Sequence, residues 1–177
     1  MSDATLDEML THVKDGAFRD LLMFSYHTGC RPQEARIVTA AHVHGKRIVF
    51  TAAESKGKKT PRVIYLDDVA AEIIERRVKM FPVGMVFRNR NGTPWCKDTI
   101  GARFQRLSKR IGKRVFAYAL RHSYVTDALK NDVDPVSLAV LIGHSDPSTL
   151  ARIYQHLAQD QEHMLDVAKK AKPKRKT

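Results

Sequence analysis

The sequence predicts an α+β fold that is mostly helical and contains a small three-stranded antiparallel sheet. Apolar residues recur with helical spacing along most of the 177 residues. Between residues 43 and 66 this period changes, and short β-rich runs separated by turn residues take its place. The length suits one domain with its own core, and 43% hydrophobic with 28% charged residues is typical of a soluble globular protein.

Two helices are expected first, over residues 5–12 and 15–26. The second is apolar on nearly all sides, which predicts a buried helix. Gly29 is placed to end it as a left-handed cap, and Pro32 is placed to begin a further short helix.

Three β-rich runs are expected next, at residues 42–44, 47–51 and 62–66. Gly45 and Lys46 provide the first turn. Residues 55–59, which include three lysines, provide the second. Short turns between three such runs predict an antiparallel sheet.

The next two helices have one apolar side each. Asp67 or Asp68 begins the first, which residues 81–84 end, and its apolar residues are Val69, Ala70, Ile73 and Ile74. The second covers residues 98–111. Its apolar side consists of Ile100, Phe104, Leu107 and Ile111, and its basic stripe consists of Arg103, Arg106, Arg110 and Lys113. The stripe is either a solvated face or a surface that lies along a phosphate backbone.

The C-terminal third predicts further helices. One is expected over residues 120–129, and another begins at Asp134–Pro135 and ends at Gly143. Asp146 and Pro147 repeat that start signal, so Tyr154 is expected about two turns into a helix. A last helix is expected over residues 159–168, before a basic disordered tail at 169–177.

The composition limits the classes of partner and cofactor. A net charge of +12 favours a polyanionic partner, most simply nucleic acid, although membranes and acidic proteins also attract basic chains. Cys30 and Cys96 are too few for a disulfide framework, which suits a reducing cytoplasm. No apolar run has membrane-spanning length, and no signal peptide opens the chain. The histidines and cysteines lack metal-ligand spacing, and Ala52 replaces the glycine that a phosphate loop around 57–60 would need, so no metal or cofactor is expected.

Arginine, histidine and tyrosine recur between Tyr118 and His156. Such side chains can hold a phosphodiester while a tyrosine oxygen attacks it. The unperturbed pKa of tyrosine is about 10, so the barrier must fall mainly through stabilisation of charge on the phosphoryl oxygens. Arginine offers a planar fork of donors for this purpose, and a lysine on a hairpin can protonate the departing 5′ oxygen.

Four segments resemble, in order, the signatures of the tyrosine recombinases (phage-integrase family). They are TGCRPQEA at 28–35, ALRHS at 119–123, LIGH at 141–144 and RIYQH at 152–156. A basic hairpin lies between the first and the second. The resemblance covers roughly residues 16–156 and implies the catalytic domain of such an enzyme, a mostly helical fold with a small three-stranded sheet.

The resemblance also implies a role for each matching residue. Arg31 and Arg121 would clamp the scissile phosphate, and His144 would donate a hydrogen bond to it. Tyr154 would be the nucleophile that forms a 3′-phosphotyrosyl bond, with Lys56 as general acid. Tyr118 completes the predicted catalytic set, and Glu34 and His122 are predicted as supporting residues. The predicted DNA-binding residues are Lys58, Lys59, Arg103, Arg106, Arg110 and Lys113.

Two positions depart from the family pattern. The family usually has histidine three residues before its second arginine, where this chain has Tyr118. A phenol can donate a hydrogen bond to a phosphate oxygen but cannot carry the charge of an imidazolium. Tyr154 also follows His144 by ten residues, where nine is usual. Structural interpretations remain open as well, because Arg31 and Arg121 could be core arginines in salt bridges and Tyr154 an ordinary half-buried tyrosine.

These observations lead to one hypothesis with two alternatives. Residues 1–168 are expected to form the catalytic domain of a site-specific recombinase, without the N-terminal core-binding domain of the family. The expected partners are double-stranded DNA and, for the full-length protein, three further copies in a tetramer on DNA; the chain alone is expected to be a monomer with no membrane association. The expected location is the cytoplasm of a bacterium, close to the nucleoid. The alternatives are a catalytically impaired member that only binds DNA, and an enzyme that relaxes supercoils like a type IB topoisomerase.

Overall fold

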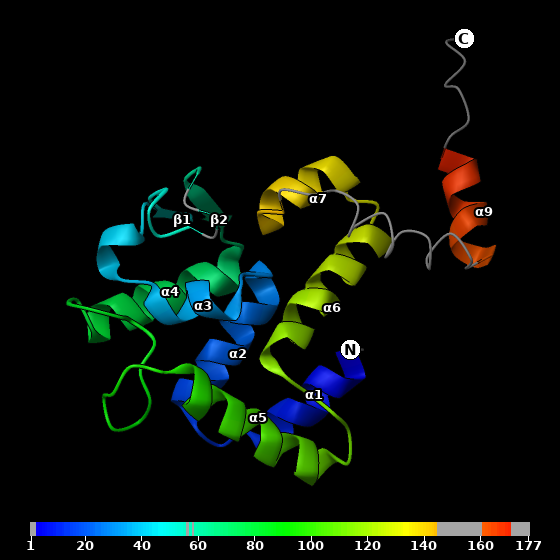
Figure 1. Ribbon diagram of the computed structural model, residues 1–177. Coiled ribbons are helices and arrows are strands. Elements are labelled where there is room, and N and C mark those ends of the chain that lie inside the picture. The colour runs from blue at the N-terminus through cyan, green and yellow to red at the C-terminus, as the bar shows by residue number, and fades with distance from the viewer. Residues whose placement is uncertain (1–2, 56, 58, 145–160, 171–177) are drawn as a thin grey trace. The chain divides into compact units, whose positions relative to one another are not determined.

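The computed structural model (Figure 1) describes residues 3–55, 57, 59–144 and 161–170. The chain divides into two compact units, Met1–Val125 and Thr126–Thr177, and each is described by itself. The structure is mostly helical and contains a small antiparallel sheet, which confirms the predicted class.

The first two helices begin and end close to their predicted bounds. They are α1 (Asp3–His12) and α2 (Gly16–Thr28). Asp15 caps α2 because its carboxylate accepts hydrogen bonds from the amides of Ala17 and Phe18. The predicted burial of α2 is confirmed on the side that packs against α3 (Pro32–Ile37) and α4 (Asp68–Met80).

The sheet of the first unit contains two strands, β1 (Arg47–Phe50) and β2 (Arg62–Tyr65). They pair antiparallel, with Ile48 opposite Ile64. The run predicted at residues 42–44 does not form a third strand. In the part of the chain that the structure describes, it contributes a single bridge from Val43 to Ile48. The strand count therefore differs from the prediction, because the preceding residues form the short helix η1 (Ala40–His42), in which the His42 ring accepts a hydrogen bond from the Thr39 amide.

Two amphipathic helices complete the core of the first unit. Asp67 caps α4 by accepting a hydrogen bond from the Ala70 amide, as predicted, although Val69 is exposed rather than buried. α5 (Lys97–Ile111) buries all four residues of its predicted apolar side and packs against α1. The shared core combines side chains of α1, α2, both strands, α4, α5 and the start of α6 (Ala117–Lys130).

The second unit contains the end of α6, then α7 (Pro135–Ile142) and α9 (Gln161–Lys170). Asp134 caps α7 at its start, and Gly143 ends it with φ of 65°, as predicted. The predicted tail begins too early, because Lys169 and Lys170 belong to the last turn of α9. Positive side chains stabilise that end of a helix through its dipole. The predicted helix around Tyr154 lies outside the described residues. No helix in the described part of the chain is long and apolar enough to cross a membrane.

Candidate active site

The turn between α2 and α3 positions the first predicted arginine. Gly29 adopts φ of 57° and ends α2 by donating its amide to the carbonyl of Ser25. The Thr28 hydroxyl accepts a hydrogen bond from the Cys30 amide at 3.3 Å. These local contacts fix the backbone that leads into Arg31, which is the N-cap residue of α3.

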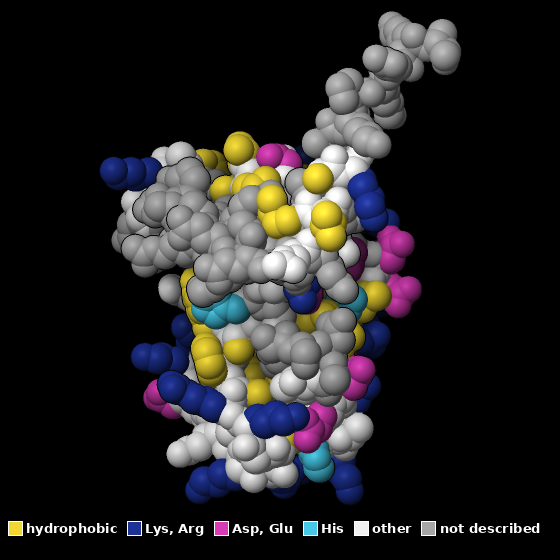
Figure 2. Space-filling view, turned by 90° about the vertical axis from the view of Figure 1, so that its right-hand side faces the viewer, with side chains coloured by type: hydrophobic (Ala, Val, Ile, Leu, Met, Phe, Trp, Pro, Cys, Tyr) yellow, Lys and Arg dark blue, Asp and Glu magenta, His cyan; other side chains and the backbone are white. Residues whose placement is uncertain are grey.

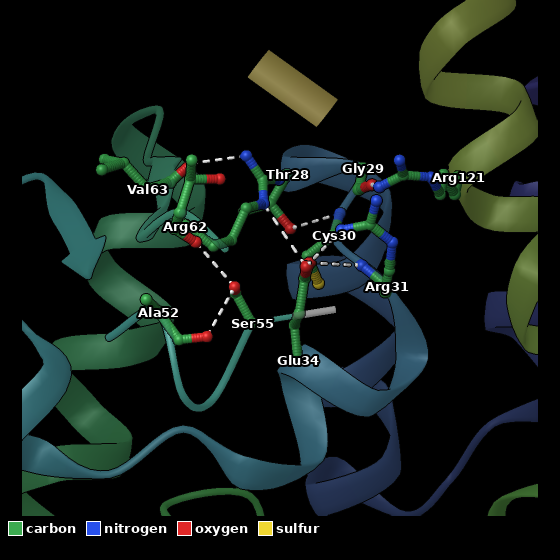
Figure 3. Close-up of polar contacts among 11 residues, drawn as sticks. Thr28, Gly29, Cys30, Arg31, Glu34, Ala52, Ser55, Arg62, Val63 and Arg121 are labelled. Carbon is green, nitrogen blue, oxygen red and sulfur yellow. Dashed lines mark hydrogen bonds and ion pairs between the residues drawn. The ribbon is translucent and has the colours of Figure 1, made fainter. Parts of the chain in front are cut away.

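Glu34 holds Arg31 at two points (Figure 3). Its Oε2 accepts a hydrogen bond from the Arg31 amide at 2.8 Å, and its Oε1 accepts one from Arg31 Nη1 at 2.7 Å. The backbone contact closes a capping box, since Glu34 is the third residue of α3. Glu34 thus contacts both the backbone and the guanidinium of Arg31, and its supporting role stays a prediction.

A second arginine shares the Glu34 carboxylate. Arg62, the first residue of β2, directs Nε to Glu34 Oε1 at 3.4 Å and donates from Nη1 to the Val63 carbonyl at 2.6 Å. Its side chain is 6% exposed. Sequence reasoning missed Arg62. The available signal was strand alternation, because Arg62 shares an inward face with Ile64, and a charge on that face needs a partner.

Arg121 reaches the same turn from α6. It is 2% exposed, and its Nη1 donates a hydrogen bond to the Gly29 carbonyl at 2.6 Å. Burial lowers the pKa of Arg121, and the positive charge of Arg31 lowers it further. Arg31 and Arg121 are therefore brought together at one turn, as the prediction requires.

Within the group of Arg31, Arg62, Arg121 and Glu34, the positive charges outnumber the negative one. Arg31, Arg62 and Arg121 carry three positive charges, and Glu34 supplies one carboxylate. Burial also lowers the pKa of Arg62, while the Glu34 carboxylate opposes that shift. Guanidinium groups in such a setting favour a bound anion, and their planar forks suit the oxygens of a phosphate.

Tyr118 and His122 lie one turn apart on α6. Their rings contact edge to face with centroids 5.2 Å apart, and Tyr118 is 40% exposed. Partial burial and the neighbouring Arg121 charge lower the pKa of His122, so its neutral form is favoured. Tyr118 thus presents a hydrogen-bonding phenol near Arg121, whose pKa it also influences.

The loop that carries the predicted lysines is closed at its base. The Ser55 hydroxyl contacts the carbonyls of Ala52 and Thr60 at 2.9 Å and 2.6 Å, which joins the two sides of the loop (Figure 3). Lys59 is exposed. Lys56 and Lys58 lie outside the described residues, as does Tyr154.

His144 belongs to the second unit. It follows the left-handed Gly143, and its amide donates to the Ala139 carbonyl at 2.9 Å. These contacts end α7 in the manner that the sequence predicted. The roles predicted for His144, Tyr154 and Lys56 remain predictions, as do the catalytic and supporting roles of the other predicted site residues.

The basic stripe of α5 divides into two kinds of residue. Arg103 forms a 2.6 Å ion pair with Asp15, and Lys113 forms one with Glu8 at 2.8 Å. Arg106 bonds within its own helix to the Ala102 carbonyl, and Arg110 approaches the His12 carbonyl. Lys and Arg side chains lie at several separate places on the face drawn in Figure 2, interspersed with Asp and Glu, so the positive charge there is spread.

Among the residues that the structure describes, no group of three or more His, Cys, Asp or Glu side chains could hold a metal ion. The polar chemistry of the site instead comes from guanidinium groups. The Glu34 carboxylate lies between Arg31 and Arg62 and bonds to both (Figure 3).

Comparison with known proteins identifies the family of this mostly helical domain. Residues 2–161 match the Phage integrase family, and the chain belongs to that family. Tyrosine recombinase XerD of Halalkalibacterium halodurans is 29% identical over 149 residues, which are 78% of this chain and 49% of the relative. Tyrosine recombinase XerC of Bradyrhizobium diazoefficiens is 32% identical over 173 residues, 92% of this chain and 51% of the relative. The chain thus spans about half the length of these relatives.

Solved structures share the fold. The catalytic domain of bacteriophage HP1 integrase has a TM-score of 0.69 at 20% identity, covering 98% of this chain and 95% of that one. XerA recombinase has a TM-score of 0.75 at 17% identity, with 98% and 64% covered. The Tn1549 transposon integrase in complex with transposon right end DNA has a TM-score of 0.77 at 20% identity, with 95% and 65% covered. The predicted resemblance to tyrosine recombinases is confirmed.

Proposed function

We propose that the protein cuts and rejoins DNA strands in site-specific recombination, through a covalent bond between Tyr154 and a 3′ phosphate. The observation that carries this proposal is the pair Arg31 and Arg121, which meet at the turn around Gly29. Two guanidinium groups with an excess of positive charge suit a phosphodiester whose charge grows during attack. The names of the relatives and the family itself support the same reaction.

The proposed reaction follows from the chemistry of these groups. The Tyr154 phenol releases its proton to solvent as its oxygen attacks phosphorus, the bond to the 5′ oxygen breaks, and that oxygen takes a proton from Lys56. Arg31, Arg121 and His144 stabilise the phosphoryl oxygens meanwhile. Attack by a 5′ hydroxyl reverses the step, so the phosphotyrosyl bond conserves the energy of the broken linkage and the chain itself uses neither water nor a nucleotide.

The proposed partner is double-stranded DNA. The Tn1549 integrase and the XerH recombinase with its difH substrate have both been solved as DNA complexes. For this chain we expect weak, salt-sensitive binding, because a basic surface releases counterions from DNA. Tight binding that salt does not weaken would contradict this expectation.

We further propose that copies of the protein assemble as a tetramer on DNA, in the bacterial cytoplasm near the nucleoid. The exposed Met164 and Leu165 of α9 support a packing role for residues 158–170, because two large apolar side chains side by side in the sequence are left in solvent. Deletion of this segment is expected to reduce assembly on DNA. Unchanged assembly would count against the role.

Covalent trapping tests the proposed reaction. The protein is incubated with a pool of nicked duplexes whose broken strand cannot religate, and denaturing gels compare wild type with Tyr154→Phe. A slow-migrating adduct that the substitution abolishes is expected. An adduct that survives would assign the nucleophile to another tyrosine, and no adduct from a pool that contains a bound site would refute cleavage.

One observation favours a second candidate, a member that binds DNA without cutting it. Tyr118 occupies the position where the family usually has histidine, and a phenol cannot supply an imidazolium charge to the phosphate. Tyr118→His separates the two functions. An adduct that forms only with this substitution would favour the impaired binder, whereas similar rates for both proteins would favour the enzyme.

A further inference from the structure

We propose that Arg62 is a positioning residue, which acts through Glu34 to orient Arg31 and to keep the charge of Arg31 available to the phosphate. This inference rests on the proposed function. Arg62 does not belong to the four sequence segments that identified the site, and it comes from a different element, β2.

The geometry makes Glu34 the link between two arginines. Glu34 Oε1 lies 2.7 Å from Arg31 Nη1 and 3.4 Å from Arg62 Nε, so one oxygen serves both side chains. Figure 3 shows the Glu34 carboxylate between them, with Arg31 on one side and Arg62 on the other. Because Arg62 also bonds to the Val63 carbonyl, its guanidinium is fixed to the strand.

Burial makes this arrangement electrostatically consequential. The side chains of Arg62 and Glu34 are 6% and 9% exposed, so little solvent screens their charges. Arg31 is the nearer of the two arginines to Glu34, so without Arg62 the carboxylate would act on Arg31 alone of this pair and would neutralise it more fully. With Arg62 present, the group of Arg31, Arg62, Arg121 and Glu34 keeps an excess of two positive charges.

Arg62 also ties the lysine-bearing loop to the turn that carries Arg31. The loop leads from Ser55 to Thr60, and Ser55 joins its two sides. β2 begins at Arg62, two residues after Thr60, so the strand that follows the loop is anchored at its first residue to α3 through Glu34. The positioning role therefore concerns the relation between the loop of the predicted general acid and the predicted phosphate clamp.

The test compares Arg62→Met with a matched control, Arg77→Met. Arg77 is buried like Arg62 and donates from Nε to a carboxylate, that of Asp20, at 2.8 Å, but it lies on α4 and pairs with α2. Both substitutions remove a buried ion pair. At a temperature where circular dichroism shows both variants folded, Arg62→Met is expected to slow adduct formation by about tenfold or more. The rate is measured at saturating DNA, so weaker DNA binding does not account for the loss. Arg77→Met is expected to leave the rate within about twofold of wild type. This corresponds to a much smaller change in the activation barrier than a tenfold loss of rate.

Two further variants separate positioning from stability. Arg62→Lys restores the charge and is expected to recover part of the rate. In the Glu34→Gln background, Arg62→Met is expected to change the rate less than threefold (roughly 0.7 kcal/mol), because the path through Glu34 is already broken. The proposal would be overturned if Arg62→Met and Arg77→Met slowed adduct formation equally. It would also be overturned if Arg62→Met slowed the Glu34→Gln protein as much as it slows wild type.

A second readout does not require cleavage. Inorganic phosphate is added while the Nε–H resonances of the arginines are followed by NMR, and Arg62→Met is expected to weaken binding at least threefold. If wild type forms no adduct but phosphate binding depends on Arg62, the proposed function fails and the positioning role stands. If adduct forms and neither its rate nor phosphate binding depends on Arg62, the positioning role alone fails.

Discussion

The ring of Tyr124 lies directly against the Cα of Gly29. A Cβ at residue 29 would lie 2.4 Å from Tyr124 Cδ1 and 2.7 Å from Cγ, closer than real contacts allow. The same glycine has φ of 57°, and its carbonyl accepts the hydrogen bond from Arg121. Close approach of α6 to the turn therefore sets the position of Arg121 and depends on the absence of a side chain at residue 29.

We expect Gly29→Ala to lower the free energy of unfolding by more than the cost of placing alanine in a left-handed conformation. Gly45 provides the control, since it also has φ of 57° but no atom within 4 Å of an added Cβ. Gly45→Ala should cost about 1 kcal/mol from the left-handed conformation. Gly29→Ala should cost a further 1–3 kcal/mol, roughly, from overpacking against Tyr124. Urea unfolding measures both, and equal losses would mean that the ring moves aside freely.

Local chemistry explains which parts of the fold could be predicted from the sequence. The ends of α2 and α7 depend on Asp15, Gly29, Asp134 and Gly143, whose capping preferences act within a few residues. The apolar side of α5 was predictable for the same reason, because its period is visible along the chain.

Contacts between distant residues explain what could not be predicted. The pair of Arg62 with Glu34 joins residues 28 positions apart, and that of Arg103 with Asp15 joins residues 88 apart. No local pattern distinguishes Arg103 from Arg106 on the stripe. The strand predicted at residues 42–44 does not form, because the His42 side chain accepts a hydrogen bond from the Thr39 amide and caps the short helix η1. This local hydrogen bond competes with strand pairing.

The two thiols should react very differently. Burial raises the pKa of Cys30 from 9.0 to about 11, whereas the Thr99 hydroxyl and amide lower the pKa of the exposed Cys96. Since the thiolate is the reactive form, iodoacetamide at pH 8 should modify Cys96 alone in the folded protein. Mass spectrometry of peptides after labelling with and without urea measures this. Labelling of Cys30 at the same rate as Cys96 without urea would contradict the burial of Cys30.

Cys30 should also give the protein a pH-dependent stability in alkali. Its folded pKa of about 11 exceeds its ordinary 9.0, so the unfolded chain ionises first. The contribution of the neutral thiol is complete below pH 9 and is lost as pH rises toward 11, by on the order of 2–3 kcal/mol. Cys30→Ala should remove this part of the slope between pH 9 and 11. An identical slope in wild type and variant would refute the shift.

Acid should loosen the anchored base of the lysine loop. Hydrogen bonds from the Thr51 hydroxyl and amide, followed by that from His42, lower the pKa of Glu54 from 4.5 to about 2. A lowered pKa means that the contribution of the carboxylate is present above pH 4.5 and is lost as pH falls through about 2. The Thr51 amide resonance should therefore titrate near pH 2. Glu54→Gln should abolish this transition, and a midpoint near 4.5 in wild type would show that Glu54 is not held.

Arg103 and Arg106 should differ in what they do on the basic stripe. The Arg103 guanidinium pairs with Asp15 at 2.6 Å and lies 5.7 Å and 5.6 Å from the ring centroids of Phe18 and Trp95. Its side chain is 30% exposed. Arg103→Ala should therefore reduce stability by about 1–2 kcal/mol through lost pairing and packing.

Arg106 is better placed than Arg103 to meet a phosphate. In the structure its guanidinium bonds to the Ala102 carbonyl of its own helix. Arg106→Ala should leave stability within about 0.5 kcal/mol. It should lower the slope of log K against log salt for DNA binding by about 1, as expected for one lost phosphate contact, whereas Arg103→Ala should leave that slope unchanged. Binding titrations at several salt concentrations, beside urea unfolding, distinguish the two residues. If both variants lowered the slope equally and neither lost stability, the ion pair of Arg103 with Asp15 would be dispensable for stability. The two arginines would then be equivalent, and both would face DNA.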